Sequence, residues 1–427
     1  MSTRTINLLP INLILLFNIT TFLLFLSNTL IDYPINNNFT LSLFVIINNI
    51  LIYIGFIFGI KIKSKSIKLR NINFTLIMFI GFFAYIAIFY PILKHYTGNI
   101  DFVSAFTDPL SAYKAMASSI SGDRSERIGI ILTKTLLSPF IIVSIPLFLY
   151  FSLSYSKYKI YTFIITTLFI SMSVFRGTDK ELFDIFIIFI AILLLHRGRK
   201  NFWDKNKFHL LSFKRILFIG VAITIILGLF SYKKSERLGT VTQYCFPNTD
   251  ICHPLDFNGN ISMVSVGIYM FYRYLTQGYY GLSIAMDADY DGGYGFGHSR
   301  PLQYLASKLG DIDFSSNIIN QLDDSGWSST GVWSTGYSWI ANDVPFTLIP
   351  FLLMFFSFIM GFAYKQVILR ECKFSIFIFT YLFFSFIYMP ANLQLAQSGD
   401  FYFGFLFWFS LYIILIICSS IKEKFKG

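Results

Sequence analysis

The chain has 427 residues, of which 55% are hydrophobic, 19% aromatic and only 13% charged. An ordinary soluble domain is about a quarter charged, so this composition excludes a soluble globular protein, whose surface needs more polar side chains than this chain has. The formal net charge of +11 is typical of a membrane protein whose cytoplasmic loops collect Lys and Arg, and because no nucleic-acid-binding motif accompanies it, no nucleic-acid partner is expected.

A transmembrane helix needs about 20 mostly apolar residues. The first such stretch follows Arg4 and is not followed by a small-residue cleavage site, so we interpret it as an uncleaved first span. The sequence therefore predicts an all-α polytopic membrane protein with about ten transmembrane helices. The ten stretches are 8–30, 40–60, 72–93, 129–153, 160–175, 180–196, 215–231, 343–364, 374–390 and 401–420.

Lysine and arginine gather in three segments that ten spans would place on one side of the membrane. Residues 61–70 hold five cations and no acid, residues 197–215 hold seven cations against Asp204, and three lysines lie within 422–426. Because cytoplasmic loops carry an excess of Lys and Arg, this side is predicted to be cytoplasmic, together with both chain termini.

The first sizeable loop on the other side runs from residue 94 to about residue 128. Asp108 and Pro109 form a helix-start signal, and the apolar residues that follow recur at helical spacing. We therefore expect an amphipathic helix that lies on the membrane surface.

The turn between the fifth and sixth stretches carries Arg176 and Lys180, and Asp184 lies about one turn inside the sixth stretch. Ionisable groups at membrane depth are costly and are functional candidates by default. The planar fork of Arg176 suits a phosphate group. The alternative is a structural ion pair that closes the hairpin, since Lys180 and Asp184 are spaced i, i+4.

The largest polar segment lies between the seventh and eighth stretches and is predicted to be an extracytoplasmic loop. It divides the chain into a membrane domain at 1–230, the loop at 231–342 and a second membrane domain at 343–427. Cys245 and Cys252 lie in this loop and are expected to form a disulfide in an oxidising compartment. The alternatives are two unpaired thiols or a zinc site, but His253 is the only imidazole nearby and zinc wants four ligands.

Three clusters of the loop contain candidate binding residues. Arg273 precedes Tyr279 and Tyr280, which are bracketed by glycines and are suited to stacking on sugar rings or to a place at the membrane interface. Trp333 lies in a segment dense in hydroxyl and indole groups, for which the same two interpretations apply. Arg273 is harder to explain by the interface alone.

The third cluster, residues 287–300, begins with three acids at alternate positions and continues with four glycines. Asp287, Asp289 and Asp291 match the first positions of a calcium loop, but the twelfth position is His298 where such a loop has Glu. The preferred interpretation is a Gly-rich loop that presents His298 and Arg300. A histidine titrates near neutrality and can act as a general base.

Together these features resemble the Wzy-type oligosaccharide repeat-unit polymerases (O-antigen polymerases). The topology carries the resemblance over most of the chain. Locally it depends on Phe175-Arg-Gly-Thr-Asp-Lys180, Gln277-Gly-Tyr-Tyr-Gly-Leu-Ser283, Gly297-His-Ser299 and Trp333-Ser-Thr-Gly-Tyr337 with Asn342-Asp343.

The resemblance implies that a growing glycan on undecaprenyl diphosphate is transferred to a lipid-linked repeat unit at the periplasmic face of the bacterial inner membrane. It implies no cofactor and no metal. A chain-length regulator and a flippase are the implied protein partners. On this basis Arg176, Arg273 and Arg300 would stabilise the diphosphate, and His298 or a nearby Asp would take the proton of the acceptor hydroxyl. Residues expected to bind substrate are Tyr279, Tyr280, Lys180, Asp184, Asp291 and Trp333.

Three other functions compete with this one. An O-antigen ligase has similar chemistry but transfers to a lipid A-core acceptor. A flippase or transporter is expected to have repeat-related helices, which the sequence does not show. A membrane O-acyltransferase usually takes its donor from the cytoplasm, whereas the polar residues here cluster on the other side.

Overall fold

A computed structural model describes residues 6–62, 72–97, 102–121, 124–204, 213–239, 242–247, 249–257, 260–289, 292–329 and 331–424. The chain is mostly helical. A helix occupies each of the ten predicted hydrophobic stretches. These helices are α1 (Leu9–Leu26), α2 (Asn38–Lys61), α3 (Phe74–Thr97), α6 (Arg124–Ser152), α7 (Lys159–Phe175), α8 (Lys180–Trp203), α9 (Phe213–Leu238), α14 (Ile349–Arg370), α15 (Lys373–Tyr388) and α16 (Gly399–Lys424).

Seven helical segments in the described ranges are long and apolar enough to cross a membrane: those of α1, α2, α3, α6, α7, α14 and α16. The protein is therefore a multi-pass helical membrane protein, as the composition predicts. Of the other three, α15 is apolar but has only 16 residues, while α8 and α9 carry charged residues in their end turns.

Helix α15 lies at the centre of the bundle, where it packs against α14, α8, α6 and α1. Nearly all of its side chains are buried, so it is surrounded by protein rather than lipid. Helices α2 and α14 also pack closely. A Cβ atom at Gly55 would lie 2.2 Å from the carbonyl oxygen of Met354, and one at Gly361 would lie 2.3 Å from that of Phe56. Small residues allow this close approach of two membrane helices.

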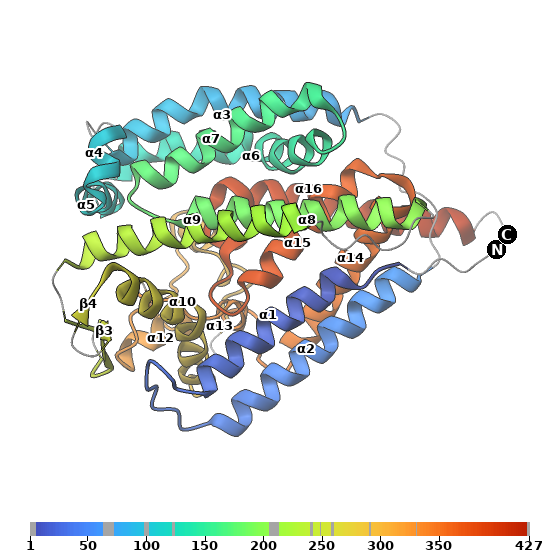
Figure 1. Cartoon of the computed structure of the whole chain (residues 1–427). Coiled ribbons are helices and arrows are strands. Elements are labelled where there is room, and N and C mark those ends of the chain that lie inside the picture. Colours follow the sequence, from blue (N-terminus) through green and yellow to red (C-terminus); the bar gives the residue numbers. More distant parts are fainter. Residues whose placement is uncertain are drawn as a thin grey trace.

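The short elements gather at one end of the bundle, away from the first turn of α1 and the last turn of α16 (Figure 1). They are α4 (Phe102–Thr107), α5 (Pro109–Ser121), β1 (Gln243–Cys245), β2 (Cys252–Pro254), β3 (Asp256–Phe257), β4 (Asn260–Ile261), α11 (Arg300–Leu309), α12 (Ile318–Asp324) and α13 (Gly336–Ala341), and the longer helix α10 (Met263–Ala285) lies among them. Two short 3-10 helices complete the fold, η1 (Ser156–Tyr158) and η2 (Gln394–Gln397).

Helix α5 occupies the predicted amphipathic segment, so the expectation of a helix there is confirmed. The Asp108 carboxylate caps its first turn by accepting hydrogen bonds from the N–H and the hydroxyl of Ser111, at 3.0 and 2.6 Å. Helix α5 contacts α3 and α9. Its position relative to the membrane surface stays a prediction.

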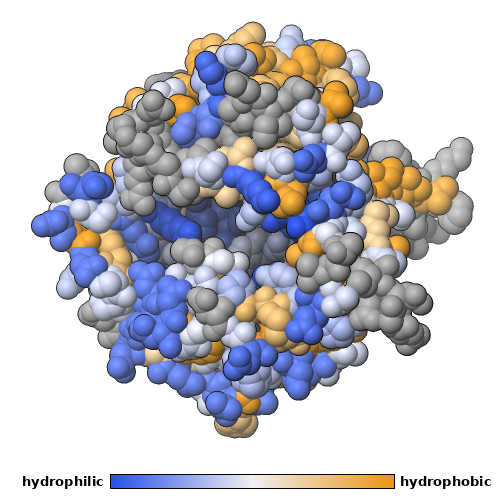
Figure 2. Space-filling view, turned by 90° about the vertical axis from the view of Figure 1, so that its left-hand side faces the viewer, coloured by the Kyte–Doolittle hydropathy of each residue, from blue (hydrophilic) through white to orange (hydrophobic). Residues whose placement is uncertain are grey.

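Figure 2 views the molecule from the end that carries these short elements. Hydrophilic residues dominate this face, and the face is hollowed near its centre. The sides of the bundle differ, because Leu16, Phe83 and Phe351 are each more than 60% exposed there. Apolar side chains exposed along the sides and polar ones at the end are the pattern expected of a bundle surrounded by lipid.

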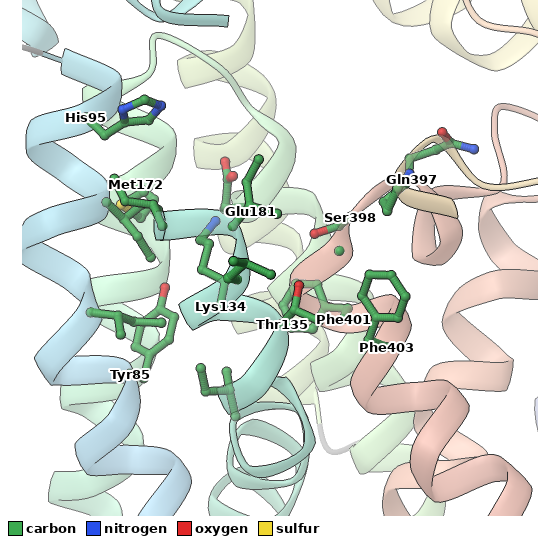
Figure 3. A pocket seen from close by; sticks show the side chains of 18 of the residues that line it. Tyr85, His95, Lys134, Thr135, Met172, Glu181, Gln397, Ser398, Phe401 and Phe403 are labelled. Atoms are coloured by element: carbon green, nitrogen blue, oxygen red, sulfur yellow. The ribbon is translucent and has the colours of Figure 1, made fainter. Parts of the chain in front are cut away.

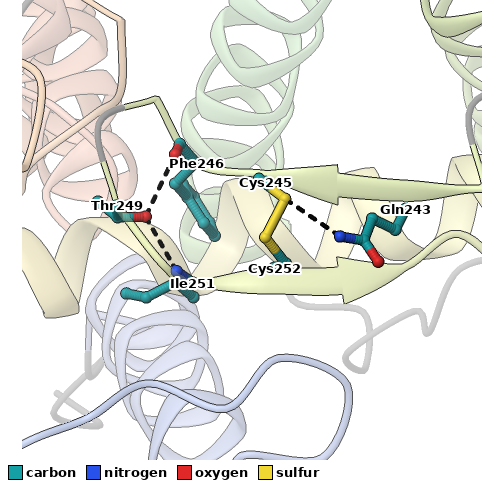
Figure 4. The surroundings of a disulfide bond; sticks show 6 residues. All are labelled: Gln243, Cys245, Phe246, Thr249, Ile251 and Cys252. Carbon is teal, nitrogen blue, oxygen red and sulfur yellow. Dashed lines mark hydrogen bonds between the residues drawn. A yellow bond between two sulfur atoms is a disulfide. The ribbon is translucent and has the colours of Figure 1, made fainter.

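Strands β1 and β2 form an antiparallel hairpin that a disulfide between Cys245 and Cys252 closes (Figure 4). The turn is held by Thr249, whose hydroxyl donates to the Phe246 carbonyl at 3.2 Å and accepts from the Ile251 N–H at 3.2 Å. This hairpin packs on α10, which begins with a capping box formed by Ser262 and Ser265.

Candidate functional site

A cavity of about 560 Å³ lies between α3, α6, α7, α8, α11 and the segment that joins η2 to α16 (Figure 3). Its lining has a charged and polar part and an apolar part. Charged and polar side chains come from the end of α7, the start of α8, α11, the segment that joins η2 to α16 and, with Lys134 and Thr135, from within α6. Aromatic and aliphatic side chains line the remainder, chiefly Tyr85, Ile88, Phe89, Ile92, Ile141, Phe169 and Met172.

The cavity brings together four of the residues that the sequence singled out. Arg176, Lys180 and Asp184 reach it from the α7–α8 turn, and Arg300 reaches it from the first residue of α11. These two groups are more than 100 residues apart in the sequence. Two of the three arginines expected to stabilise the diphosphate, Arg176 and Arg300, therefore line one cavity.

The turn that positions Arg176 depends on a glycine. Arg176 ends α7, and Gly177 follows in the left-handed region at φ +57°, which favours glycine. A Cβ atom at Gly177 would lie 2.4 Å from the carbonyl oxygen of Pro109 in α5. The turn and the start of α5 are therefore in direct contact, and this contact leaves no room for a side chain.

An ion pair closes this hairpin, but it is not the Lys180–Asp184 pair that the i, i+4 spacing suggests. Arg176 Nη1 lies 2.6 Å from Glu181 Oε1, and the Thr178 hydroxyl donates to the other Glu181 oxygen at 3.3 Å. Asp184 instead accepts a hydrogen bond from the Tyr388 hydroxyl of α15 at 2.7 Å. Both carboxylates are nearly inaccessible, at 6% and 2% exposure.

Two buried lysines of α9 support the same turn from its other side. Lys233 and Lys234 lie 3.4 and 3.3 Å from the two carboxylate oxygens of Asp179. Lys233 also donates to the Thr178 carbonyl at 2.8 Å. The α7–α8 turn is therefore fixed by α5, by α9 and by its own ion pair.

Arg300 is held by neutral groups. Its Nη2 donates to the Ser329 carbonyl at 2.8 Å, and its guanidinium carbon lies 5.4 Å from the centre of the Trp339 ring. Within the described ranges no carboxylate forms a salt bridge with it. Burial lowers the pKa of Arg300 and the Asp323 carboxylate opposes that shift, but an arginine stays charged at neutral pH.

His298 lies two residues before Arg300, outside the cavity lining. Its Nδ1 is 2.6 Å from Asp343 Oδ2, and its Nε2 is hydrogen bonded to the Tyr402 hydroxyl at the start of α16. Asp343 also accepts the N–H groups of Gly295, Gly297 and His298 at 3.0, 2.8 and 2.8 Å. An Asp–His pair of this kind orients an imidazole for proton transfer.

The Gly-rich segment around His298 is explained by its contact with Asp343. Cβ atoms at Gly293 and Gly297 would lie 2.5 and 2.7 Å from atoms of Asp343 and Asn342 respectively. The backbone N–H groups can then surround the carboxylate, as in other anion-binding backbone nests. Asp291, a predicted substrate-binding residue, lies outside the described residues.

Arg273 does not reach the cavity. It is buried on α10, with its guanidinium carbon 4.2 Å from the ring centre of Tyr244 and 4.8 Å from that of Phe246, both in or next to the disulfide-closed hairpin. Its Nε donates to Gln277 at 2.9 Å. The structure therefore gives Arg273 a packing role between α10 and the hairpin.

The predicted aromatic residues also lie away from the cavity. Tyr279 is buried and donates to the Asn18 carbonyl of α1 at 3.1 Å. Tyr280 packs against Trp327, with ring centres 4.9 Å apart. Trp333 packs against the Tyr274 ring in the same way at 4.8 Å.

Sequence reasoning missed two residues of the cavity that carry charge, Lys134 and Glu181. Lys134 is the only charged residue of the predicted stretch 129–153, and a charge inside a span is itself a functional signal. Glu181 gave a weaker signal, as an acid in the first turn of a helix. Tyr388 and Tyr402 gave none, because their partners are distant in sequence.

Comparison of the chain with protein-family models, with curated proteins and with solved structures finds no match in any of the three.

Proposed function

We propose that this protein is a membrane glycosyltransferase that polymerises oligosaccharide repeat units carried on undecaprenyl diphosphate. One observation supports this proposal above the others. A single cavity has cations at the polar end of the bundle and an apolar wall that continues between the helices. A ligand with an anionic head and a hydrocarbon tail is complementary to such a lining.

The dimensions and charges of the cavity agree with that ligand. Its apolar wall follows α3 from His95 to Tyr85, which is about 15 Å at the helical rise of ~1.5 Å per residue. The lining carries four cations, Lys134, Arg176, Lys180 and Arg300, against two carboxylates. Its net positive charge suits a diphosphate, which is more highly charged than a carboxylate or a monoester.

The proposed reaction joins a sugar hydroxyl of one lipid-linked unit to the anomeric carbon of another. The new C–O bond forms as the bond from the anomeric carbon to the diphosphate breaks, and the diphosphate leaves with the bonding electron pair. Arg300 and Arg176 stabilise the charge that develops on it. His298, oriented by Asp343, takes the proton of the acceptor hydroxyl, which replaces the Tyr402 hydroxyl at Nε2.

The proposed topology has ten spans, with α8, α9 and α15 added to the seven apolar helices. It places both termini in the cytoplasm and residues 231–342 outside the bacterial inner membrane. Two observations support it: the cationic segments would share one side, and the short elements of 243–341 lie at the opposite end from the start of α1 and the end of α16 (Figure 1). A flippase and a chain-length regulator are the proposed partners.

The test is the lipopolysaccharide ladder of the source bacterium without this gene, complemented with variants at equal protein levels. Arg300→Ala, Arg176→Ala and His298→Ala should leave single repeats on the core, while Lys159→Ala, at the opposite end of α7, should restore the ladder. Normal ladders from all three site variants would refute the site. Loss of every repeat from the core in the deletion strain would instead identify a ligase.

A further inference from the structure

Arg300 is held in a different way from Arg176, the other arginine of the cavity. Its Nη2 donates to the Ser329 carbonyl at 2.8 Å, which is its only hydrogen bond within the described ranges. Arg176 instead contacts the Glu181 carboxylate at 2.6 Å. A carboxylate in direct contact fixes an arginine but also neutralises much of its charge, whereas a carbonyl fixes it and leaves the charge unpaired. Arg300 can therefore be fixed in place and still bind an anion in the cavity.

The Ser329 carbonyl needs a support of its own, because Ser329 lies in a segment without helix or strand between α12 and α13. Asp323, near the end of α12, provides that support. One carboxylate oxygen of Asp323 accepts a hydrogen bond from the Ser329 N–H at 2.8 Å, and the other accepts one from the Ser329 hydroxyl at 2.6 Å. Hydrogen bonds to a carboxylate are stronger than those between neutral groups. Two of them on one residue constrain its orientation and the direction of its carbonyl.

Both sides of this support are anchored in the fold. Helix α12 packs against α10 and α13, and the Ile319 N–H in its first turn donates at 3.1 Å to the side chain of Asn342, which is fully buried. Trp327, between Asp323 and Ser329 in the sequence, is also fully buried. Asp323 itself is exposed, so replacing its carboxylate leaves no cavity in the core. Its two hydrogen bonds to Ser329 therefore connect a fixed helix to the group that holds Arg300.

We propose that Asp323 is a positioning residue for Arg300. The Asp323 carboxylate fixes Ser329, and the Ser329 carbonyl fixes the guanidinium. Because the carboxylate acts through a peptide group and not by direct contact, the charge of Arg300 stays available to a ligand. The binding of a lipid diphosphate by Arg300 rests on the proposed function. The role of Asp323 requires only that an anion binds Arg300 in the cavity.

The test is the affinity of the purified protein, in detergent, for farnesyl diphosphate and for inorganic diphosphate. Arg300→Gln should weaken farnesyl diphosphate binding about tenfold or more, the loss expected for one charge-assisted hydrogen bond. Asp323→Asn should weaken it about threefold to tenfold, because the guanidinium is then less well oriented. Loss of a carboxylate near a cationic site would by itself strengthen anion binding, so a weakening cannot be a charge effect. Asp324→Asn, the matched control at the next and also exposed residue, should not weaken binding.

Two more variants separate positioning from a structural role. Ser329→Ala keeps every charge and the carbonyl but removes the hydroxyl contact with Asp323, so it should also weaken binding, by less than Asp323→Asn does. In an Arg300→Gln background, Asp323→Asn should change the affinity by less than about twofold, because two residues that act through one contact are not additive. A residue that only supports the fold would have the same effect with and without Arg300.

The outcomes also separate this inference from the proposed function. Wild-type or higher affinity in Asp323→Asn overturns the positioning role, and if Arg300→Gln is weakened in the same assay the cavity remains the headgroup site. An equal loss from Asp323→Asn with and without Arg300 overturns it as well. Inorganic diphosphate bound as tightly as farnesyl diphosphate, with the same response to Asp323→Asn, supports the positioning role but overturns the lipid source. Failure of the wild type to bind either probe overturns both proposals.

Discussion

The clearest quantitative prediction concerns His253 in the disulfide-closed hairpin. This imidazole is 2% exposed, and neither ring nitrogen has a hydrogen-bond partner among the described residues. It packs between the rings of Tyr244, Phe246 and Tyr269, with centres 5.6 to 5.9 Å away. Burial lowers the pKa of His253 from 6.5 to about 4, and the nearby Arg273 adds to the shift.

The direction in which pH changes the free energy of unfolding depends on whether the folded or the unfolded state binds the proton. Between pH 6.5 and about 4 the unfolded chain protonates this histidine and the folded protein does not. Acidification therefore destabilises the fold across that window, by about 1.4 kcal/mol per pH unit and ~3 kcal/mol in total. Above pH 6.5 the full stability is present, and below about pH 4 this group causes no further change.

The assay compares the free energy of unfolding of wild type and His253→Phe in mixed detergent micelles from pH 7 to pH 4. Phenylalanine keeps the ring packing and does not titrate, so the wild type should lose about 3 kcal/mol relative to the variant over this range. Tyr269→Phe, in the same aromatic cluster, should keep the wild-type pH dependence. Parallel curves for wild type and His253→Phe would refute the reasoning, because they would show that the imidazole is protonated equally in both states.

Three further predictions concern the α7–α8 turn, the disulfide-closed hairpin and the Asp343–His298 pair. Gly177→Ala should cost about 1–3 kcal/mol of stability and shorten the polysaccharide ladder, because the added Cβ meets the α5 backbone. Gly129→Ala has open space around it and should change neither stability nor the ladder. Equal melting temperatures for the two variants would contradict this prediction. Cys245→Ser should lower stability by about 2.5 kcal/mol, the entropy of an eight-residue loop, and should abolish the effect of reductant on the melting temperature. Asp343→Asn should reduce the rate of polymerisation of purified lipid-linked units about 100-fold or more, and Tyr402→Phe should reduce it less than tenfold. A larger loss in Tyr402→Phe than in Asp343→Asn would exclude His298 as the base.

The helices at the hydrophobic stretches could be predicted because their signal is local. A run of about 20 apolar residues is sufficient to indicate a membrane helix, and α2 and α14 are found where that rule places them. Helix α10 shows the limit of the rule. It is a 23-residue helix within the segment interpreted as a loop. Its buried residues Val266, Met270, Arg273 and Gln277 recur at helical spacing, but polar residues interrupt the apolar run.

The site could be predicted only in part, because its residues gave local signals while their meeting depends on tertiary contacts. Arg176, Arg300 and Arg273 all stood out as cations on the side opposite the cationic loops. The structure places the first two at one cavity and stacks the third on aromatic rings of the hairpin. The same sequence signal therefore marks a candidate ligand-binding arginine and a packing arginine, and only the environment of each separates them.

Two helix N-termini at the cavity explain why an acid, Glu181, is found among its cations. The first residues of α8 and of α11, Lys180 and Arg300, both line the cavity, so two helix starts with their partial positive charges lie at its polar end. Glu181, in the first turn of α8, is favoured there by that dipole as well as by Arg176. Its presence is therefore accounted for by the stability of the hairpin. Arg300 differs, because the Ser329 carbonyl and the Trp339 ring hold it and no carboxylate in the described ranges forms a salt bridge with it, so its charge is available to the anionic ligand proposed above.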